Sequence, residues 1–118
     1  MKKFLFAILV LIVPMASLAA TLTWSVPTYS DNTVIPASIA ATIVYTPYMG
    51  DSVTGPWTTG TKTAPGILSA TMPDPAAGTT KYYTVSAQIP GGVESPKAIP
   101  ASKTILKTLG APSIILIQ

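Results

Sequence analysis

The chain of 118 residues contains no cysteine, no histidine and no arginine. Without cysteine and histidine, its own residues cannot build the usual zinc sites, Ser-His-Asp or Cys-His catalysis, haem ligation through histidine, or iron–sulfur clusters. It has only four acidic residues, too few and too scattered for a calcium site of six or more oxygens. We therefore expect no metal, no other cofactor and no enzymatic activity. The acidic residues, each expected in a turn that its side chain stabilises by bonding nearby backbone, are Asp31, Asp51, Asp74 and Glu94.

The first 19 residues have the layout of a secretory signal peptide. Two lysines follow Met1, residues 4–13 form an unbroken apolar run, and small residues precede Ala19. Ser17 and Ala19 form the best small-residue pair for cleavage, so we place the cut after Ala19. A retained membrane anchor is the alternative, but the run is shorter than the roughly 20 residues of a spanning helix and Pro14 interrupts it. We expect an exported protein of the periplasm, the cell surface or the medium, without membrane contact after cleavage.

Removal of this segment changes the charge of the chain. The 99 remaining residues carry five lysines against four acidic residues, a net charge of +1. Single lysines without arginine and without a basic stripe do not fit phosphate recognition, so nucleic acid is not an expected partner. About a hundred residues suffice for one hydrophobic core. An exported domain without cysteine has to be held by packing and sheet hydrogen bonds alone.

Strand-like alternation dominates the rest of the sequence. Beyond residue 20, apolar residues never keep helical spacing over ten residues without a proline or glycine, whereas period-two alternation recurs. Short strands joined by Gly/Pro turns predict an all-β domain with two antiparallel sheets packed as a sandwich. Pro90, Gly91 and Gly92 predict a hairpin turn. The predicted strands are 21–26, 38–46, 57–62, 67–72, 81–89 and one within 97–108.

Three short motifs in the right order resemble a fibronectin type III domain. Leu22-Thr23-Trp24-Ser25-Val26-Pro27 is similar to its start, Tyr82-Tyr83-Thr84-Val85-Ser86-Ala87 to its penultimate strand, and Gly91-Gly92-Val93-Glu94-Ser95-Pro96 to its final hairpin. The resemblance spans nearly all of 21–108 and implies an immunoglobulin-like sandwich with Trp24 between the sheets, where alternation also places it. At the position of the family's usual corner tyrosine this chain has Lys81.

The resemblance also implies a missing strand. Such domains begin with a strand that pairs with the one bearing the tryptophan, and cleavage leaves only Ala20 ahead of Thr21. We therefore predict three parts: a signal peptide (1–19), a fibronectin type III-like domain lacking its own first strand (20–108), and a hinge with an extra C-terminal strand (109–118). The candidate assembly strand consists of Ile114, Ile115, Leu116 and Ile117.

Three positions are open for this C-terminal strand. It can pack on its own sandwich, occupy the vacant first-strand position of another copy, or contact another partner or a membrane. In the resembled sandwich the last strand ends at the pole opposite the beginning of the first. At about 3.3 Å per residue, the hinge 109–112 is too short to cross the domain and leave an antiparallel strand in the chain's own vacancy. Exchange between copies would be head-to-tail and would generate filaments.

Two other surfaces are candidates for binding. The resemblance places two loops at one pole of the sandwich, a common position for recognition residues. Their candidate residues are Tyr29, Asp31, Asn32, Gly91, Gly92 and Glu94. Tyr48 and Trp57, beside Gly50, Gly55 and Pro56, could form an aromatic platform for sugar, although packing of the two rings inside the fold is the stronger expectation.

The sequence thus favours a non-enzymatic exported protein. The first hypothesis is a structural or surface protein, a filament subunit linked head-to-tail by its C-terminal strand, with protein, including its own copies, as partner. The alternative is a monomeric adhesion or recognition module that binds a protein or a polysaccharide through its pole loops. Oligomers that form only when residues 109–118 are present would distinguish the first hypothesis from the alternative.

Overall fold

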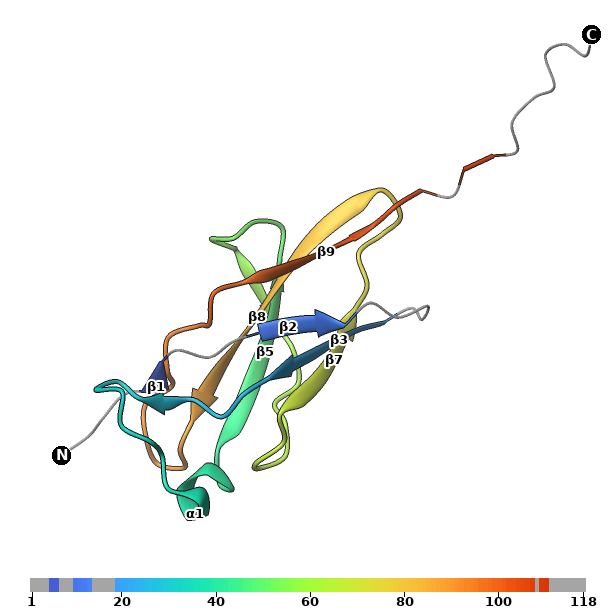
Figure 1. Cartoon of the computed structure of the whole chain (residues 1–118). Helices are drawn as coiled ribbons and strands as arrows, with labels where there is room; N and C mark the ends of the chain where they lie inside the picture. Colours follow the sequence, from blue (N-terminus) through green and yellow to red (C-terminus); the bar gives the residue numbers. More distant parts are fainter. Residues whose placement is uncertain (1–4, 7–9, 14–18, 108, 111–118) are drawn as a thin grey trace, which may run out of the picture.

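The structure, a computed structural model of the whole chain, describes residues 5–6, 10–13, 19–107 and 109–110. These residues form the all-β sandwich of two antiparallel sheets that the alternation predicts (Figure 1). One sheet has the order β2-β3-β7 and the other β6-β5-β8-β9; β1 and β4 form a separate pair. The elements are β1 (Leu5–Phe6), β2 (Val10–Val13), β3 (Ala19–Trp24), β4 (Thr28–Tyr29), α1 (Ala37–Ala40), β5 (Val44–Gly50), β6 (Trp57–Thr59), β7 (Ser69–Pro73), β8 (Thr79–Gln88) and β9 (Ala101–Ile105).

One hydrophobic core lies between the two sheets. On β3, Leu22 is fully buried and Trp24 is 6% exposed, which confirms the expected place of the tryptophan. The Trp24 ring packs against Tyr45 of β5, with centroids 5.2 Å apart. Tyr83 of β8 is fully buried, and burial raises the pKa of both Tyr45 and Tyr83 to about 12. Full burial of a large apolar side chain stabilises the fold by about 1.5–3 kcal/mol relative to its exposure.

The segment 38–46, predicted as one strand, is a helical turn followed by the start of β5. α1 begins directly after Pro36, and its alanines favour helical backbone. Ile39 and Ile43 are four residues apart, a spacing that fits one helical turn as well as alternate strand positions. The strand prediction is wrong here because so short an apolar pattern satisfies both periods.

β5 also continues farther than predicted, through Pro47 to Gly50. Proline lacks the N–H that a central strand usually needs. Hydrogen bonds from Gly60 N to Pro47 O (2.8 Å) and from Thr63 N to Tyr45 O (2.9 Å) show that the main-chain groups of Tyr45 and Pro47 face the β6 side of the strand. Pairing with β6 begins only at Tyr48, so no ladder bond requires the missing N–H of Pro47. The remaining predicted strands are present, with ends shifted by three residues or fewer.

The first-strand position is filled in the full chain by part of the predicted signal peptide. β2 pairs antiparallel with β3, Val10 opposite Trp24 and Val13 opposite Thr21 (Figure 1). β1 pairs with β4 in the same way. The predicted vacancy therefore applies only to a chain cleaved after Ala19. Among the described residues, no helix is long and apolar enough to span a membrane.

Candidate functional site

The edge of β3 that contacts β2 is the first candidate site. Trp24 N donates to Leu68 O (3.1 Å), so the main-chain groups of Trp24 face the β7 side. Because these groups alternate along a strand, those of Thr21 and Thr23 face β2. We call this pair of main-chain positions the β3 edge. A strand bound there extends a sheet whose inward side chains, Leu22 and Trp24, already belong to the core.

The two ends of this edge can be assigned by contacts to the other sheet. At one end, Trp24 packs on Tyr45. At the other, Ala19 lies opposite Pro73, whose carbonyl accepts a hydrogen bond from Tyr83 Oη (2.8 Å). β2 runs from the Trp24 end to the Thr21 end. An antiparallel strand must therefore enter from the Trp24 end.

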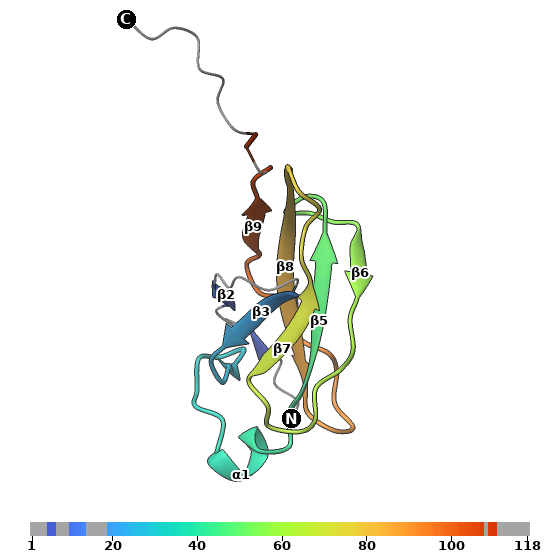
Figure 2. The ribbon, with the colours of Figure 1, turned by 90° about the vertical axis from the view of Figure 1, so that its right-hand side faces the viewer.

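The chain leaves the sandwich at the opposite end. β9 runs away from the Trp24 end and stops at Ile105, opposite Thr79 at the start of β8. Beyond it, Leu106 and Leu109 are 82% and 90% exposed. Figure 2 shows β9 pointing away from the end that carries α1. The candidate assembly strand, Ile114 to Ile117, lies outside the described residues.

The two predicted binding loops lie at the end of the sandwich near α1 (Figures 1 and 2). In the first, Asp31 accepts hydrogen bonds from the backbone N–H (3.1 Å) and hydroxyl (2.6 Å) of Thr33. Asn32 has φ 68°, and Tyr29 N donates to Thr33 O (2.9 Å). Asp31 thus stabilises its own turn, and Tyr29, in β4, is half-buried.

The second loop is the turn after β8. Gly92 N donates to Ile89 O (2.7 Å), and Gly91 has φ 78°, which favours glycine. Four residues after Pro90, Glu94 folds back onto the outward face of the four-stranded sheet. Its carboxylate accepts hydrogen bonds from the hydroxyls of Tyr48 and Ser86. Of the predicted loop residues, Glu94 is therefore tied to the sheet, while Gly91 and Gly92 shape the turn.

Electrostatics reinforce this attachment of Glu94. Hydrogen bonds from Ser86 and Tyr48 hold the pKa of the Glu94 carboxyl below its ordinary value of 4.5, and the positive charges of Lys97 and Lys62 act in the same direction. Lys97 Nζ also lies 4.3 Å from the centre of the Tyr48 ring. Ser95 N donates to Ala87 O (2.7 Å), and Ala98 N to Val85 O (2.9 Å), so residues 94–98 are bound along β8.

The aromatic platform is not formed as the sequence suggested. Tyr48 is only 8% exposed, with its hydroxyl bonded to Glu94 and its ring beside Lys97. Trp57 is half-buried and packs on glycine backbone: a Cβ added at Gly50 or Gly55 would lie 2.9 or 3.0 Å from its ring atoms. Both rings pack locally, Tyr48 on the outward face of the four-stranded sheet and Trp57 against glycine backbone, and neither belongs to the core cluster between the sheets.

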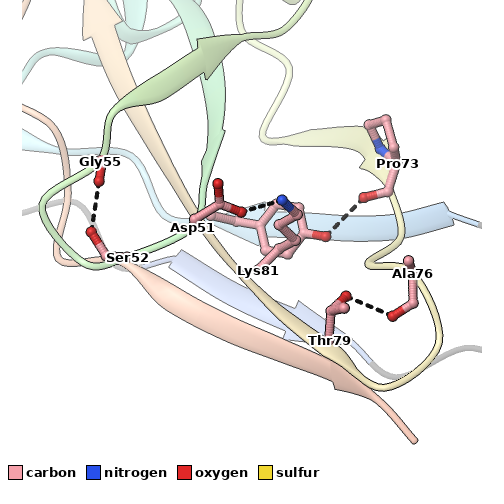
Figure 3. A network of polar contacts seen from close by, with 8 residues as sticks. Asp51, Ser52, Gly55, Pro73, Ala76, Thr79 and Lys81 are labelled. Carbon is pink, nitrogen blue, oxygen red and sulfur yellow. Dashed lines mark hydrogen bonds and ion pairs between the residues drawn. The ribbon is translucent and has the colours of Figure 1, made fainter. Parts of the chain in front are cut away.

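Two lysine–aspartate pairs lie at the end where β3 begins. Lys103 Nζ is 2.6 Å from Asp74 Oδ1, and both side chains are about nine-tenths buried. Lys81, opposite Lys103 in the sheet, pairs with Asp51, which is largely exposed (Figure 3). Lys81, at the family's usual corner-tyrosine position, thus forms an ion pair.

These contacts correct the expectation for the acidic residues. The sequence predicted that each would bond the backbone of its own turn, and within the described residues only Asp31 does so. The others bind side chains far away in the sequence, which no local motif reveals. Within the described residues, no group of three or more acidic side chains could hold a metal ion.

Comparison with known proteins supports the fold. A solved structure described as an Fn3-like protein from Clostridium thermocellum matches with a TM-score of 0.57 and 24% identity, over 91% of this chain and 96% of that chain. A solved myokine structure matches with a TM-score of 0.51 and 14% identity, over 91% of this chain and all of that chain. No family model and no curated protein matches the sequence. The domain therefore has a fibronectin type III-like, immunoglobulin-like sandwich fold.

The length of these matches bears on the first strand. A match over 91% of 118 residues covers about 107 residues, whereas only 99 follow Ala19. The matched span thus includes part of the predicted signal peptide, in agreement with the position of β2 beside β3.

Proposed function

We propose that the mature protein is an exported, non-enzymatic structural subunit of a surface filament, joined head-to-tail by its C-terminal strand. Residues 114–117 of one copy bind antiparallel to the β3 edge of the next. The observation that carries this proposal is the register of β2 on β3: cleavage after Ala19 removes a four-residue strand and exposes the backbone of Thr21 and Thr23.

The C-terminal run matches the strand that it replaces. β2 consists of Val-Leu-Ile-Val, and residues 114–117 are Ile-Ile-Leu-Ile, so both are four consecutive large aliphatic residues. Bound in the register of β2, alternate residues of 114–117 would face the core beside Leu22 and Trp24. Each fully buried aliphatic side chain stabilises the contact by about 1.5–3 kcal/mol, and the strand hydrogen bonds add to this.

Chain direction favours exchange between copies over packing within one. An antiparallel strand enters at the Trp24 end of the edge, but β9 delivers the C-terminal segment to the other end. A segment that folds back on its own domain would therefore run parallel to β3. A segment that continues outward can meet the next copy, and a contact of this type does not close on itself.

The test compares the mature chain, residues 20–118, with residues 20–110 in sedimentation velocity. We expect concentration-dependent oligomers for 20–118 and folded monomers for 20–110. If both chains sediment as monomers over the whole concentration range, the proposed assembly is excluded.

A matched pair of variants tests the acceptor edge itself. Thr23→Pro removes the N–H that faces the vacant position but leaves pairing with β7, as proline on an edge strand can. Thr23→Val keeps that N–H. Thr23→Pro should abolish the oligomers of 20–118, whereas Thr23→Val should retain them. Circular dichroism of both variants in the 20–110 background controls for folding.

The monomeric recognition module is the second candidate function. It would use Tyr29, Asp31 and Asn32, exposed or half-exposed at one end of the sandwich. The geometry favours it less, because Glu94 of the neighbouring turn is bound to Tyr48 and Ser86. Binding of a protein or a polysaccharide by chain 20–110, which lacks the C-terminal segment, would support this function instead. Substitution of Asn32 should then abolish that binding.

A further inference from the structure

The predicted cleavage bond lies inside a paired strand. Ala19 and Ala20 are the first residues of β3; Ala19 is opposite Pro73 and Ala20 opposite Met72 of β7. Ala20 is fully buried and belongs to the core cluster. The bond between them is therefore held by the sheet on one edge and, at Ala20, by side-chain packing.

A peptidase can cleave this bond only when its backbone is released from the sheet. Proteases bind the residues around the cleaved bond in an extended conformation, and a signal peptidase also requires small side chains just before that bond. Access to Ala19–Ala20 requires β3 to separate from β7. Separation at the Ala20–Met72 pair takes Ala20 out of the core, and Leu22, two residues farther along the same strand, anchors that segment to the same core cluster. The opening thus resembles unfolding of the domain more than fraying of a terminus.

We propose that the Ala19–Ala20 bond can be cleaved only before the domain folds. A chain that folds first places Val10–Val13 on the β3 edge, shields its own cleavage bond and remains closed to an incoming strand. A chain that is cleaved first folds with this edge open. The order of cleavage and folding then decides between a self-capped monomer and an assembly-competent subunit. This inference rests on the export step of the proposed function.

The experiment measures cleavage of the full-length chain by a signal peptidase in detergent micelles. Intact-mass spectrometry follows the product that begins at Ala20. The folded wild type is compared with Leu22→Asp, which places a charge in the core and prevents folding. Thr58→Asp, at an exposed position of β6, is the folded control for an added charge. We expect wild type and Thr58→Asp to be cleaved at least about a hundredfold more slowly than Leu22→Asp.

Equal cleavage rates for the folded wild type and Leu22→Asp would overturn the inference. Absence of cleavage even in Leu22→Asp would also overturn it, together with the assigned cleavage position. Failure of the assembly hypothesis is distinguishable from both, because it would be seen in the sedimentation of chain 20–118 and leaves these cleavage rates unchanged.

Discussion

The two neighbouring lysine–aspartate pairs allow a test of how burial changes the contribution of an ion pair to stability. Lys103 and Lys81 are cross-strand partners in β9 and β8, and each binds one aspartate. The side chains of Lys103 and Asp74 are 10% and 11% exposed. Those of Lys81 and Asp51 are 30% and 77% exposed. The change to make is Asp74→Asn, with Asp51→Asn as the matched control, both in the full-length chain.

The two substitutions should differ in their cost to the free energy of unfolding. Water can replace Asp51 as the partner of the more exposed Lys81, but it cannot readily replace Asp74 beside the buried Lys103. Removing one member of a buried pair leaves an uncompensated charge and costs about 3–5 kcal/mol. Asparagine can still accept a hydrogen bond from Lys103, so we expect about 3 kcal/mol for Asp74→Asn. For a domain of this size that lowers Tm by about 12–24 °C. Asp51→Asn should cost less than about 1 kcal/mol, as exposed pairs do.

Chemical denaturation followed by tryptophan fluorescence measures both variants, and the double variant Asp74→Asn/Lys103→Met completes the test. Removal of both charges should recover part of the stability lost in Asp74→Asn, because the unpaired buried ammonium is then gone. Equal destabilisation by Asp74→Asn and Asp51→Asn would refute the reasoning from burial.

Further predictions concern the turn after β8 and the positive-φ glycines. The folded-state pKa of Glu94 is lowered, so its stabilising contribution is present above the ordinary value of 4.5 and is lost as the pH falls through the folded pKa. Glu94→Gln should therefore lower the free energy of unfolding at neutral pH, and urea titrations should show the difference from wild type shrinking below pH 4.5. Gly91→Ala should cost about 1–2 kcal/mol for its φ of 78° alone, since nothing lies within 4 Å of the added Cβ. Gly66→Ala, with φ 75° and Ala41 O 3.0 Å from the added Cβ, should lower Tm more; an equal loss would contradict the contact argument.

The sequence was informative where apolar residues alternate regularly with polar ones along a strand. The alternation in β8, with Tyr83 inward, and the aromatic at Trp24 define the sandwich because each strand has one face in the core. It failed at Ile39 and Ile43, where helical and strand periods coincide. It failed again at Pro47. This proline fits into β5 only because pairing with β6 begins at Tyr48, and local sequence does not show where the neighbouring strand ends.

The candidate site also has features that the sequence shows and features that only the fold reveals. The apolar run of the C-terminal segment is visible in the sequence, and so is the need for a strand beside β3. The partners of Glu94 are not, because Tyr48 and Ser86 lie 46 and 8 residues away and approach it only when β5 and β8 pair. Nor does local sequence show that the segment expected to be cleaved would fit the first-strand position.

The absence of cysteine makes the location of the C-terminal segment directly measurable. If residues 114–117 take the register of β2, Ile115 replaces Leu11 and lies opposite Thr23. The variant Thr23→Cys/Ile115→Cys of chain 20–118 would contain the only two thiols. Under mild oxidation, antiparallel exchange should give a ladder of disulfide-linked oligomers on a non-reducing gel.

The matched control is Thr71→Cys/Ile115→Cys. Thr71 lies opposite Thr21 on β7 and is exposed, but it is not on the edge that cleavage opens. This control should give few links at the same protein concentration. A single fast-migrating monomer from Thr23→Cys/Ile115→Cys would instead mean that the segment folds back onto its own domain. Since β9 brings the segment to the Thr21 end, that product would contain a strand parallel to β3, and the head-to-tail filament would be excluded.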